Sequence, residues 1–235
     1  MSWRTNWAVL RLRNLGRALG LNRLLGALLG GRGYEDRFQA AMLGGIRQGD
    51  IVWDVGANVG LYSKKFSDIA GSSGKVFAFE PSPVNLERLN AAVASLANVT
   101  VVPVALGDRE DVVVIEQGND PLGATSRIVD KAVRRSERQV EIQLSSGDRI
   151  VASGAVAMPN VIKVDTEGFE LDVLLGLRQT LRQKSLRTLC VEIHFGLLKE
   201  RGLPDAPSDI EKLLVASGFI LAWADASHIV ATRIT

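Results

Sequence analysis

The feature that most constrains this chain is the regular alternation of short apolar runs with amphipathic segments. Ile51–Val55 and Lys75–Glu80 are apolar runs of strand length, typical of strands that are buried on both faces of a sheet. Residues 61–70 and 83–96 follow these runs with helical spacing. Strands and helices in this order predict an α/β fold, with a doubly wound parallel sheet covered by helices on both faces.

The C-terminal half continues this pattern after a less regular middle. Polar and apolar residues alternate at 112–117 and 140–144, as in a solvent-facing hairpin, and a Gly- and charge-rich segment (118–139) separates them. We expect one folded domain over residues 34–235. Its other predicted elements are a helix at 34–47, strands at 99–106, 161–164, 186–193, 220–224 and 229–234, helices at 171–183 and 208–217, and a turn that contains His228.

Composition narrows the class of protein. The chain has 235 residues, of which 46% are hydrophobic, which is enough for one sizeable core. Its net charge of +2 conceals an asymmetry, because residues 1–33 hold six arginines and no acidic residue. The remainder holds 22 basic and 26 acidic residues, and an acidic body argues against nucleic acid as a partner. The single cysteine, Cys190, lies in an apolar run, which predicts a buried thiol and fits a reducing cytoplasm.

Residues 1–33 form a basic N-terminal segment with two open interpretations. Tryptophans and leucines interrupted by arginines are compatible with an amphipathic helix that touches a membrane surface or a partner. Alternatively, the segment is a helical appendage with solvated arginines, and its several glycines favour this interpretation because they weaken a long helix. The arginines leave no apolar run long enough to span a membrane. We therefore expect a cytoplasmic protein that is at most membrane-peripheral.

The segment Asp54–Gly60 has the composition of a ligand-binding loop. Ligands of doubly wound sheets bind beyond the carboxyl ends of the strands, and this segment follows the first strand. Gly56 permits a sharp turn, Asn58 tolerates a left-handed backbone, and Gly60 opens the next helix. Asp54 is placed either to reach a cationic amino group or to order the loop.

Glu80 ends the second strand, where a carboxylate can accept hydrogen bonds from both hydroxyls of a ribose. Dinucleotide-binding folds also carry an acid here, so Glu80 alone does not distinguish nicotinamide cofactors from other nucleosides. The glycine spacing does, because Gly56-x-Asn58-x-Gly60 differs from Gly-x-Gly-x-x-Gly and no pyrophosphate cradle is evident. The predicted ligand is a nucleoside with a charged amino-acid tail.

Five motifs in a fixed order carry a resemblance to a known family. They are DVGANVGLYS at 54–63, FEPSPVNLERLN at 79–90, VALGD at 104–108, IKVDTEGFELDVLLG at 162–176 and VEIH at 191–194. The chain resembles the FkbM family of class I methyltransferases from Gly33 to the final helix. The resemblance implies a Rossmann-like, seven-stranded, mostly parallel sheet with an antiparallel last strand. It also implies S-adenosylmethionine (SAM) as methyl donor and O-methylation of a hydroxyl on a sugar, glycan or other secondary metabolite.

The resemblance also implies roles for individual residues at the cofactor. Asp54, Gly56, Asn58 and Gly60 would line the methionine end of SAM, Glu80 would bind the ribose with support from Asn85, and Leu106 and Asp108 would border the adenine. The chain departs from the family at 144–148, where Leu-Ser-Ser-Gly-Asp replaces a direct Leu-Asp. This departure leaves the role of Asp148 open.

Charged residues gather where the fourth and fifth strands end. Lys163, Asp165 and Glu167 alternate along the chain, as do Glu192 and His194, so each set would lie on one side of its strand. The simplest expectations are that Lys163 pairs with a carboxylate and that Glu167 caps the next helix.

Two mechanisms of acceptor activation are compatible with these residues. In the first, Asp165 or His194 removes the acceptor proton as general base, with Glu167 in the same catalytic cluster. In the second, Asp165, Glu192 and His194 hold a divalent metal such as Mg²⁺ that orients the acceptor hydroxyl.

Two other classes of function stay open. A non-catalytic SAM-binding or partner-binding module is disfavoured by the charged strand ends, and a nicotinamide oxidoreductase by the glycine spacing. The acceptor is expected to be a small molecule or glycan. Basic residues in 118–139 could bind a phosphate- or carboxylate-bearing acceptor such as a nucleotide-linked sugar, although a solvated helix face explains them equally simply.

Overall fold

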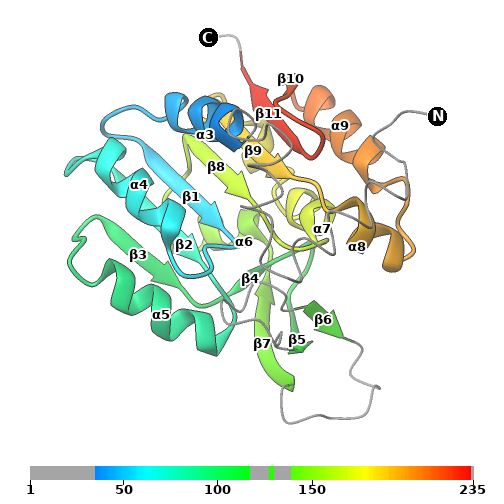
Figure 1. The fold of residues 1–235 in the computed structure, drawn as a ribbon, viewed down its shortest axis with the longest axis horizontal. Helices are drawn as coiled ribbons and strands as arrows, with labels where there is room; N and C mark the ends of the chain where they lie inside the picture. Colours follow the sequence, from blue (N-terminus) through cyan, green and yellow to red (C-terminus); the bar gives the residue numbers. More distant parts are fainter. Residues whose placement is uncertain (1–34, 117–126, 130–138, 234–235) are drawn as a thin grey trace, which may run out of the picture.

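The computed structural model describes residues 35–116, 127–129 and 139–233, which form two layers of helices around a central sheet (Figure 1). The predictions for residues 1–33 and for most of the basic segment 118–139 lie outside these residues. The central strands are β1 (Ile51–Val55), β2 (Lys75–Phe79), β3 (Val99–Val102), β8 (Val161–Val164), β9 (Thr188–Glu192), β10 (Ile220–Trp223) and β11 (His228–Thr232). The helices are α3 (Glu35–Gly44), α4 (Leu61–Ala70), α5 (Pro83–Val93), α6 (Gly147–Ala152), α7 (Glu170–Leu175), α8 (Phe195–Glu200) and α9 (Ala206–Ala216). Within the described ranges, none of them is long and apolar enough to cross a membrane.

The strand order of the seven-stranded sheet is β10-β11-β9-β8-β1-β2-β3. Neighbouring strands are parallel except at β11, which runs antiparallel to both β9 and β10. These observations confirm the predicted doubly wound sheet with a reversed last strand. The strand order turns at β1, which pairs with β2 on one side and β8 on the other. A crevice therefore opens at the carboxyl ends of these strands, where ligands bind in such folds.

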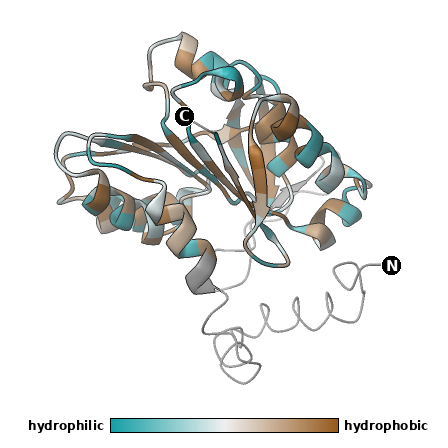
Figure 2. Cartoon of the chain, turned by 90° about the horizontal axis from the view of Figure 1, so that it is seen from above, coloured by the Kyte–Doolittle hydropathy of each residue, from teal (hydrophilic) through white to brown (hydrophobic). Residues whose placement is uncertain are grey.

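The alternation of side chains along each strand divides the core between the two faces of the sheet. Val52 and Val76 pack with Phe66 of α4 and Met42 of α3 on one face. On the other face, the neighbouring Trp53 joins a cluster that includes residues of α7 and α9. Figure 2 shows the apolar strands between the helical layers. This double burial explains why these strands are apolar at successive positions.

The thiol of Cys190 is buried in β9, as predicted. Burial raises its pKa to about 12. The side chain is therefore a structural part of the core.

A second, four-stranded sheet extends from the carboxyl end of the first. Its order is β4-β7-β5-β6, with β4 at Ala105–Leu106, β5 at Asp111–Glu116, β6 at Arg127–Val129 and β7 at Gln139–Ser145. The predicted hairpin is confirmed as the antiparallel pair β5 and β7. The prediction of one strand at 99–106 was wrong, because the chain leaves the main sheet after Val102 and Pro103 has no backbone N–H for a sheet hydrogen bond. The strand β6 was not predicted.

The chain after β7 differs from the prediction in four places. The expected helix at 171–183 ends at Leu175, and only a short 3₁₀ turn follows, at Thr180–Arg182. The short helices α6 and α8 were not predicted, and His228 begins β11 instead of lying in a turn.

Asp148 explains the departure from the family pattern at 144–148. Its carboxylate accepts hydrogen bonds from the backbone N–H groups of Gln179 and Thr180, each at 2.8 Å, and from the Thr180 hydroxyl at 2.7 Å. Ser146 caps α6 by accepting a hydrogen bond from the Arg149 N–H. The additional residues therefore tie α6 to the turn that follows α7.

We predict that Gly176→Ala destabilises the protein through a steric clash. A Cβ at Gly176 would lie 1.8 Å from the carbonyl oxygen of Gly107, although its φ of −76° suits alanine. Overpacking of this kind costs about 1–3 kcal/mol or more in free energy of unfolding, which denaturant titration measures. Gly44→Ala is the control, because a Cβ there would meet no atom of the described residues within 4 Å, and it should not destabilise the protein. Equal stability of the two variants would contradict the close contact.

Candidate active site

The loop after β1 has the left-handed backbone that its sequence predicts. Gly56, Asn58 and Gly60 have φ values of 80°, 51° and 83°. A Cβ at Gly56 would lie 1.9 Å from the carbonyl oxygen of Asp165, so only glycine fits between β1 and the residue after β8. The loop thus brings bare backbone to the crevice at the strand ends.

Glu80 is buried directly after β2 and organises this loop. Its Oε2 accepts a hydrogen bond from the Asn58 N–H at 2.9 Å, and its Oε1 accepts bonds from the Ser82 N–H at 2.9 Å and the Asn85 side-chain amide at 3.5 Å. Burial raises the pKa of Glu80 to about 7, although these hydrogen bonds oppose the shift. Asn85, also buried, therefore lies where it supports Glu80.

A cavity lies at the carboxyl ends of β1, β2 and β8. Its wall includes the predicted cofactor residues Gly56, Asn58, Glu80, Asn85 and Leu106, together with Asp165, Thr166, Glu167 and Phe169. Three other predicted cofactor residues, Asp54, Gly60 and Asp108, are not among the lining residues, so their contacts with the cofactor stay predictions. Asp108 is exposed and pairs with Arg109. Two buried oxygens of the wall, Asn58 Oδ1 and Thr166 Oγ1, make no hydrogen bond within the described part of the chain. Thr166 was not predicted from the sequence.

A buried lysine joins the strands beneath this cavity. Lys163 of β8 lies with its Nζ 3.4 Å from Asp54 Oδ1 and 3.4 Å from Asp165 Oδ2. Burial acts to lower the pKa of Lys163, but the carboxylates of Asp165 and Asp54 outweigh it and hold the pKa above the ordinary lysine value. Asp54 also accepts a hydrogen bond from Ser63 at 2.6 Å. Lys163 is thus paired as predicted, and the side chain of Asp54 links β1 to Lys163 of β8 and to Ser63 of α4.

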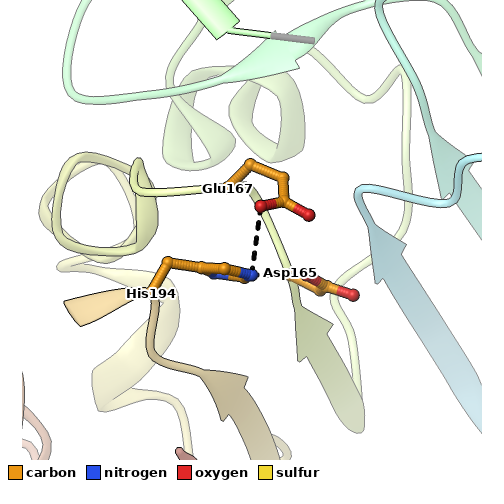
Figure 3. A group of neighbouring side chains, drawn as sticks. All are labelled: Asp165, Glu167 and His194. Carbon is orange, nitrogen blue, oxygen red and sulfur yellow. Dashed lines mark ion pairs between the residues drawn. The ribbon is translucent and has the colours of Figure 1, made fainter. Parts of the chain in front are cut away.

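His194 follows β9, and its ring lies beside Asp165 and Glu167, which both follow β8 (Figure 3). Its Nε2 lies 3.3 Å from Glu167, 3.7 Å from Asp165 and 3.7 Å from Glu192. Burial acts to lower the pKa of His194, but a hydrogen bond to Glu170 and the nearby carboxylates raise it to about 9. The structure therefore brings Asp165, Glu167, Glu192 and His194 together, while Lys163, the fifth residue predicted at the strand ends, pairs with Asp165.

Glu170 completes this group and was missed in the sequence. Its Oε1 lies 2.7 Å from His194 Nδ1 and accepts a hydrogen bond from the Gly168 N–H at 2.8 Å. The predicted capping role of Glu167 was wrong, because α7 begins without a side-chain cap and Glu167 faces His194 instead. Glu167 has a φ of 47°, a left-handed conformation that is rare outside glycine.

Glu192 connects the site to His228. Glu192 Oε2 lies 3.3 Å from His228 Nε2, and His228 Nδ1 lies 2.6 Å from Asp225. Burial acts to lower the pKa of His228, but Asp225 and Glu192 raise it to about 9. Glu192 therefore lies between two imidazoles.

Two of the three expected metal ligands, Asp165 and His194, lie close together, and the third residue beside them is Glu167. One ligand atom each of Asp165, Glu167 and His194 lies within 4.8 Å of the others. Glu167 thus takes the place that the sequence suggested for Glu192, which divides its contacts between His194 and His228.

The sheet order and the cavity at its switch point define an α/β protein with a candidate ligand site at the carboxyl ends of the strands. Comparison with known proteins gives the family. The family model described as the methyltransferase FkbM domain matches residues 54–221. The hexuronic acid methyltransferase AglP of Haloferax volcanii is 35% identical over 185 residues, which cover 78% of this chain and 68% of that protein. The chain belongs to the FkbM methyltransferase family.

Solved structures share the fold. The methyltransferase FkbM of Methylobacillus flagellatus has a TM-score of 0.53 at 17% identity over 78% of this chain, which spans only 43% of that longer chain. The fibrillarin of Aeropyrum pernix, solved with SAM, has a TM-score of 0.50 at 14% identity, covering 84% of this chain and 76% of that one. These likenesses concern the fold, which is that of a class I methyltransferase.

The residues of the cavity suit SAM as the methyl donor. The buried side-chain oxygens of Asn58 and Thr166, which make no hydrogen bond within the described residues, offer partners for a polar ligand. The carboxylate of Glu80 is at hand for ribose hydroxyls. SAM supplies an electrophilic methyl group on a sulfonium when it is bound.

We predict that SAM affinity rises with pH through about 7, because Glu80 accepts ribose hydrogen bonds best as a carboxylate and its pKa is raised to about 7. Glu80→Gln should weaken binding about 10-fold to 100-fold at pH 8, as expected for loss of a charged acceptor, and should abolish this part of the pH dependence. Calorimetric titration between pH 6 and 8.5 measures both effects. Asp209→Asn, on the exposed face of α9, should match the wild type. Identical pH profiles for wild type and Glu80→Gln would contradict the assignment.

Proposed function

We propose that this enzyme transfers the methyl group of SAM to a hydroxyl of a sugar, with a hexuronic acid as the favoured acceptor. The acceptor class follows from the relative AglP, which is named a hexuronic acid methyltransferase. The observation that carries the choice of a hydroxyl is the group around His194, at the cavity wall formed by Asp165 and Glu167.

The choice between hydroxyl and carboxyl is chemical. A sugar carboxylate has no proton to lose before methylation, whereas a hydroxyl must lose one during the transfer. A buried imidazole surrounded by carboxylates is suited to accept a proton and is superfluous for a carboxylate acceptor. The product is therefore expected to be a methyl ether.

The residues of the site have different roles in this proposal. Asp165 and Glu167 line the cavity and are placed to bind the acceptor hydroxyl, while Lys163 holds Asp165 in place. His194 does not line the cavity itself but contacts both carboxylates through Nε2. Displacement of the Glu167 side chain by the acceptor would bring the hydroxyl to Nε2, which then takes its proton as general base.

A divalent cation is a second candidate for activating the acceptor. The mutual closeness of Asp165, Glu167 and His194 favours it. Against it, the Lys163 ammonium already pairs with Asp165 and would repel a second cation there. We therefore favour activation by His194 without a metal.

The test of the function is transfer of labelled methyl from SAM to hexuronic acids, neutral sugars and lipids, with and without EDTA. We expect labelled hexuronic acid whose methyl group survives mild alkali, as an ether does, and unchanged turnover in EDTA. Label released by alkali would indicate an ester and overturn the hydroxyl assignment. Loss of turnover in EDTA, restored by Mg²⁺ or Mn²⁺, would establish the metal mechanism instead.

We predict that His194→Ala and Asp165→Asn lower turnover about 100-fold or more, as loss of a general base and its partner does. SAM binding by calorimetry should stay within about twofold for His194→Ala, because His194 does not line the cavity. In the wild type, kcat/KM should rise with pH up to about 9, since His194 must be neutral to accept the proton. Asp209→Asn is the surface control, and wild-type turnover in both site variants would contradict these roles.

A further inference from the structure

Glu170 contacts the side of the His194 ring that faces away from the cavity. Its carboxylate is completely buried in the first turn of α7. Oε1 lies 2.7 Å from His194 Nδ1, the shortest of the contacts to this ring, and the same oxygen accepts the Gly168 N–H. Burying a carboxylate costs several kcal/mol unless a cation or hydrogen bonds compensate it. The compensating partners here are a site residue and the loop that carries Glu167.

We infer that Glu170 is a positioning residue that sets the orientation and the proton location of His194 for acceptor deprotonation. By accepting the Nδ1 proton, Glu170 leaves Nε2 as the nitrogen that faces Asp165 and Glu167. By holding the Gly168 N–H, it also fixes the loop that presents Glu167. The inference deepens the proposed function and rests on it.

General-base catalysis by His194 requires that one ring nitrogen carries the proton and the other presents a lone pair to the acceptor. Neutral imidazole carries one N–H and one lone pair, and an acceptor at one nitrogen keeps the proton there. With the proton on Nδ1, the lone pair of Nε2 can take the proton that leaves the acceptor hydroxyl. The resulting imidazolium lies between the Glu170 carboxylate on one side and those of Asp165, Glu167 and Glu192 on the other. When the acceptor hydroxyl loses its proton, the positive charge therefore forms on the His194 ring, which negatively charged carboxylates already surround.

A purely structural role for Glu170 is the rival explanation. In that case its function would be the hydrogen bond from Gly168, and any similar support of the loop would have the same effect. Asp172, in the same turn of α7, provides that comparison, because it pairs with Arg201 at 2.7 Å and Arg201 also donates to the Gly168 carbonyl. Within the described part of the chain, the carboxylates that pair with the His194 imidazole do not include Asp172.

The experiment compares Glu170→Gln, Glu170→Ala and the control Asp172→Asn in the full chain. Glu170→Gln keeps a side chain that can hold the Gly168 N–H but removes the charge at Nδ1. For each variant we would measure thermal unfolding, SAM affinity by calorimetry, kcat and KM for the sugar acceptor across pH, and the ring ¹⁵N signals of His194 by NMR.

For Glu170→Gln we expect kcat to fall about tenfold or more, with SAM affinity and acceptor KM within about twofold, as when a charged hydrogen bond becomes a neutral one. The midpoint of the His194 NMR titration should fall by about one unit or more, and the inflection of kcat/KM should fall with it. Glu170→Ala should lose more turnover, and Asp172→Asn should leave the titration unchanged whatever it does to stability.

An unshifted His194 titration in Glu170→Gln, or a shift of equal size in Asp172→Asn, would overturn the assignment and leave a structural role. The NMR titration needs no acceptor, so it decides the Glu170–His194 coupling separately from the reaction. A wild-type enzyme that methylates no sugar would overturn the proposed function, whichever way that titration falls.

Discussion

The rest of the site depends on the ion pairs of the buried Lys163. It lies between Asp54 on β1 and Asp165 after β8, and so it ties the strand that leads into the cofactor loop to the strand that leads into the acceptor cluster. Asp54 and Lys163 are direct partners in the register of these parallel strands. Removing one partner of a buried ion pair costs about 3–5 kcal/mol, because it leaves an uncompensated charge. The loop after β1 and the carboxylates after β8 are therefore held by the same buried lysine.

The acceptor side is organised by a second buried cation-forming group, His194. Four carboxylates from β8, β9 and α7 surround its two ring nitrogens. Such an arrangement is stable only while the ring can carry a proton, which is why its pKa lies above the ordinary histidine value. The same property gives the site a group that accepts a proton readily when the acceptor hydroxyl approaches.

Much of the fold was predictable, because its signals are local. The buried strands β1, β2, β8 and β9 are apolar at successive positions, and the left-handed Asn58 and the turn at Gly56 follow from backbone sterics. The break at Pro103, the short helix α8 and the shortened α7 were not predicted, because they depend on which elements the chain meets after leaving the main sheet. Glu170 was missed for a similar reason, since its partner His194 is 24 residues away in the sequence.

The sequence by itself determined the class of fold, the cofactor loop and the positions of the charged strand ends, because period and residue type act over a few neighbouring residues. It also determined the family, through five motifs in order. Only the tertiary structure decided how the charges pair: Lys163 with two aspartates, Glu167 facing His194 and Glu170 behind it. Pairing depends on strand order and register, and these bring together side chains whose separation in the chain carries no signal.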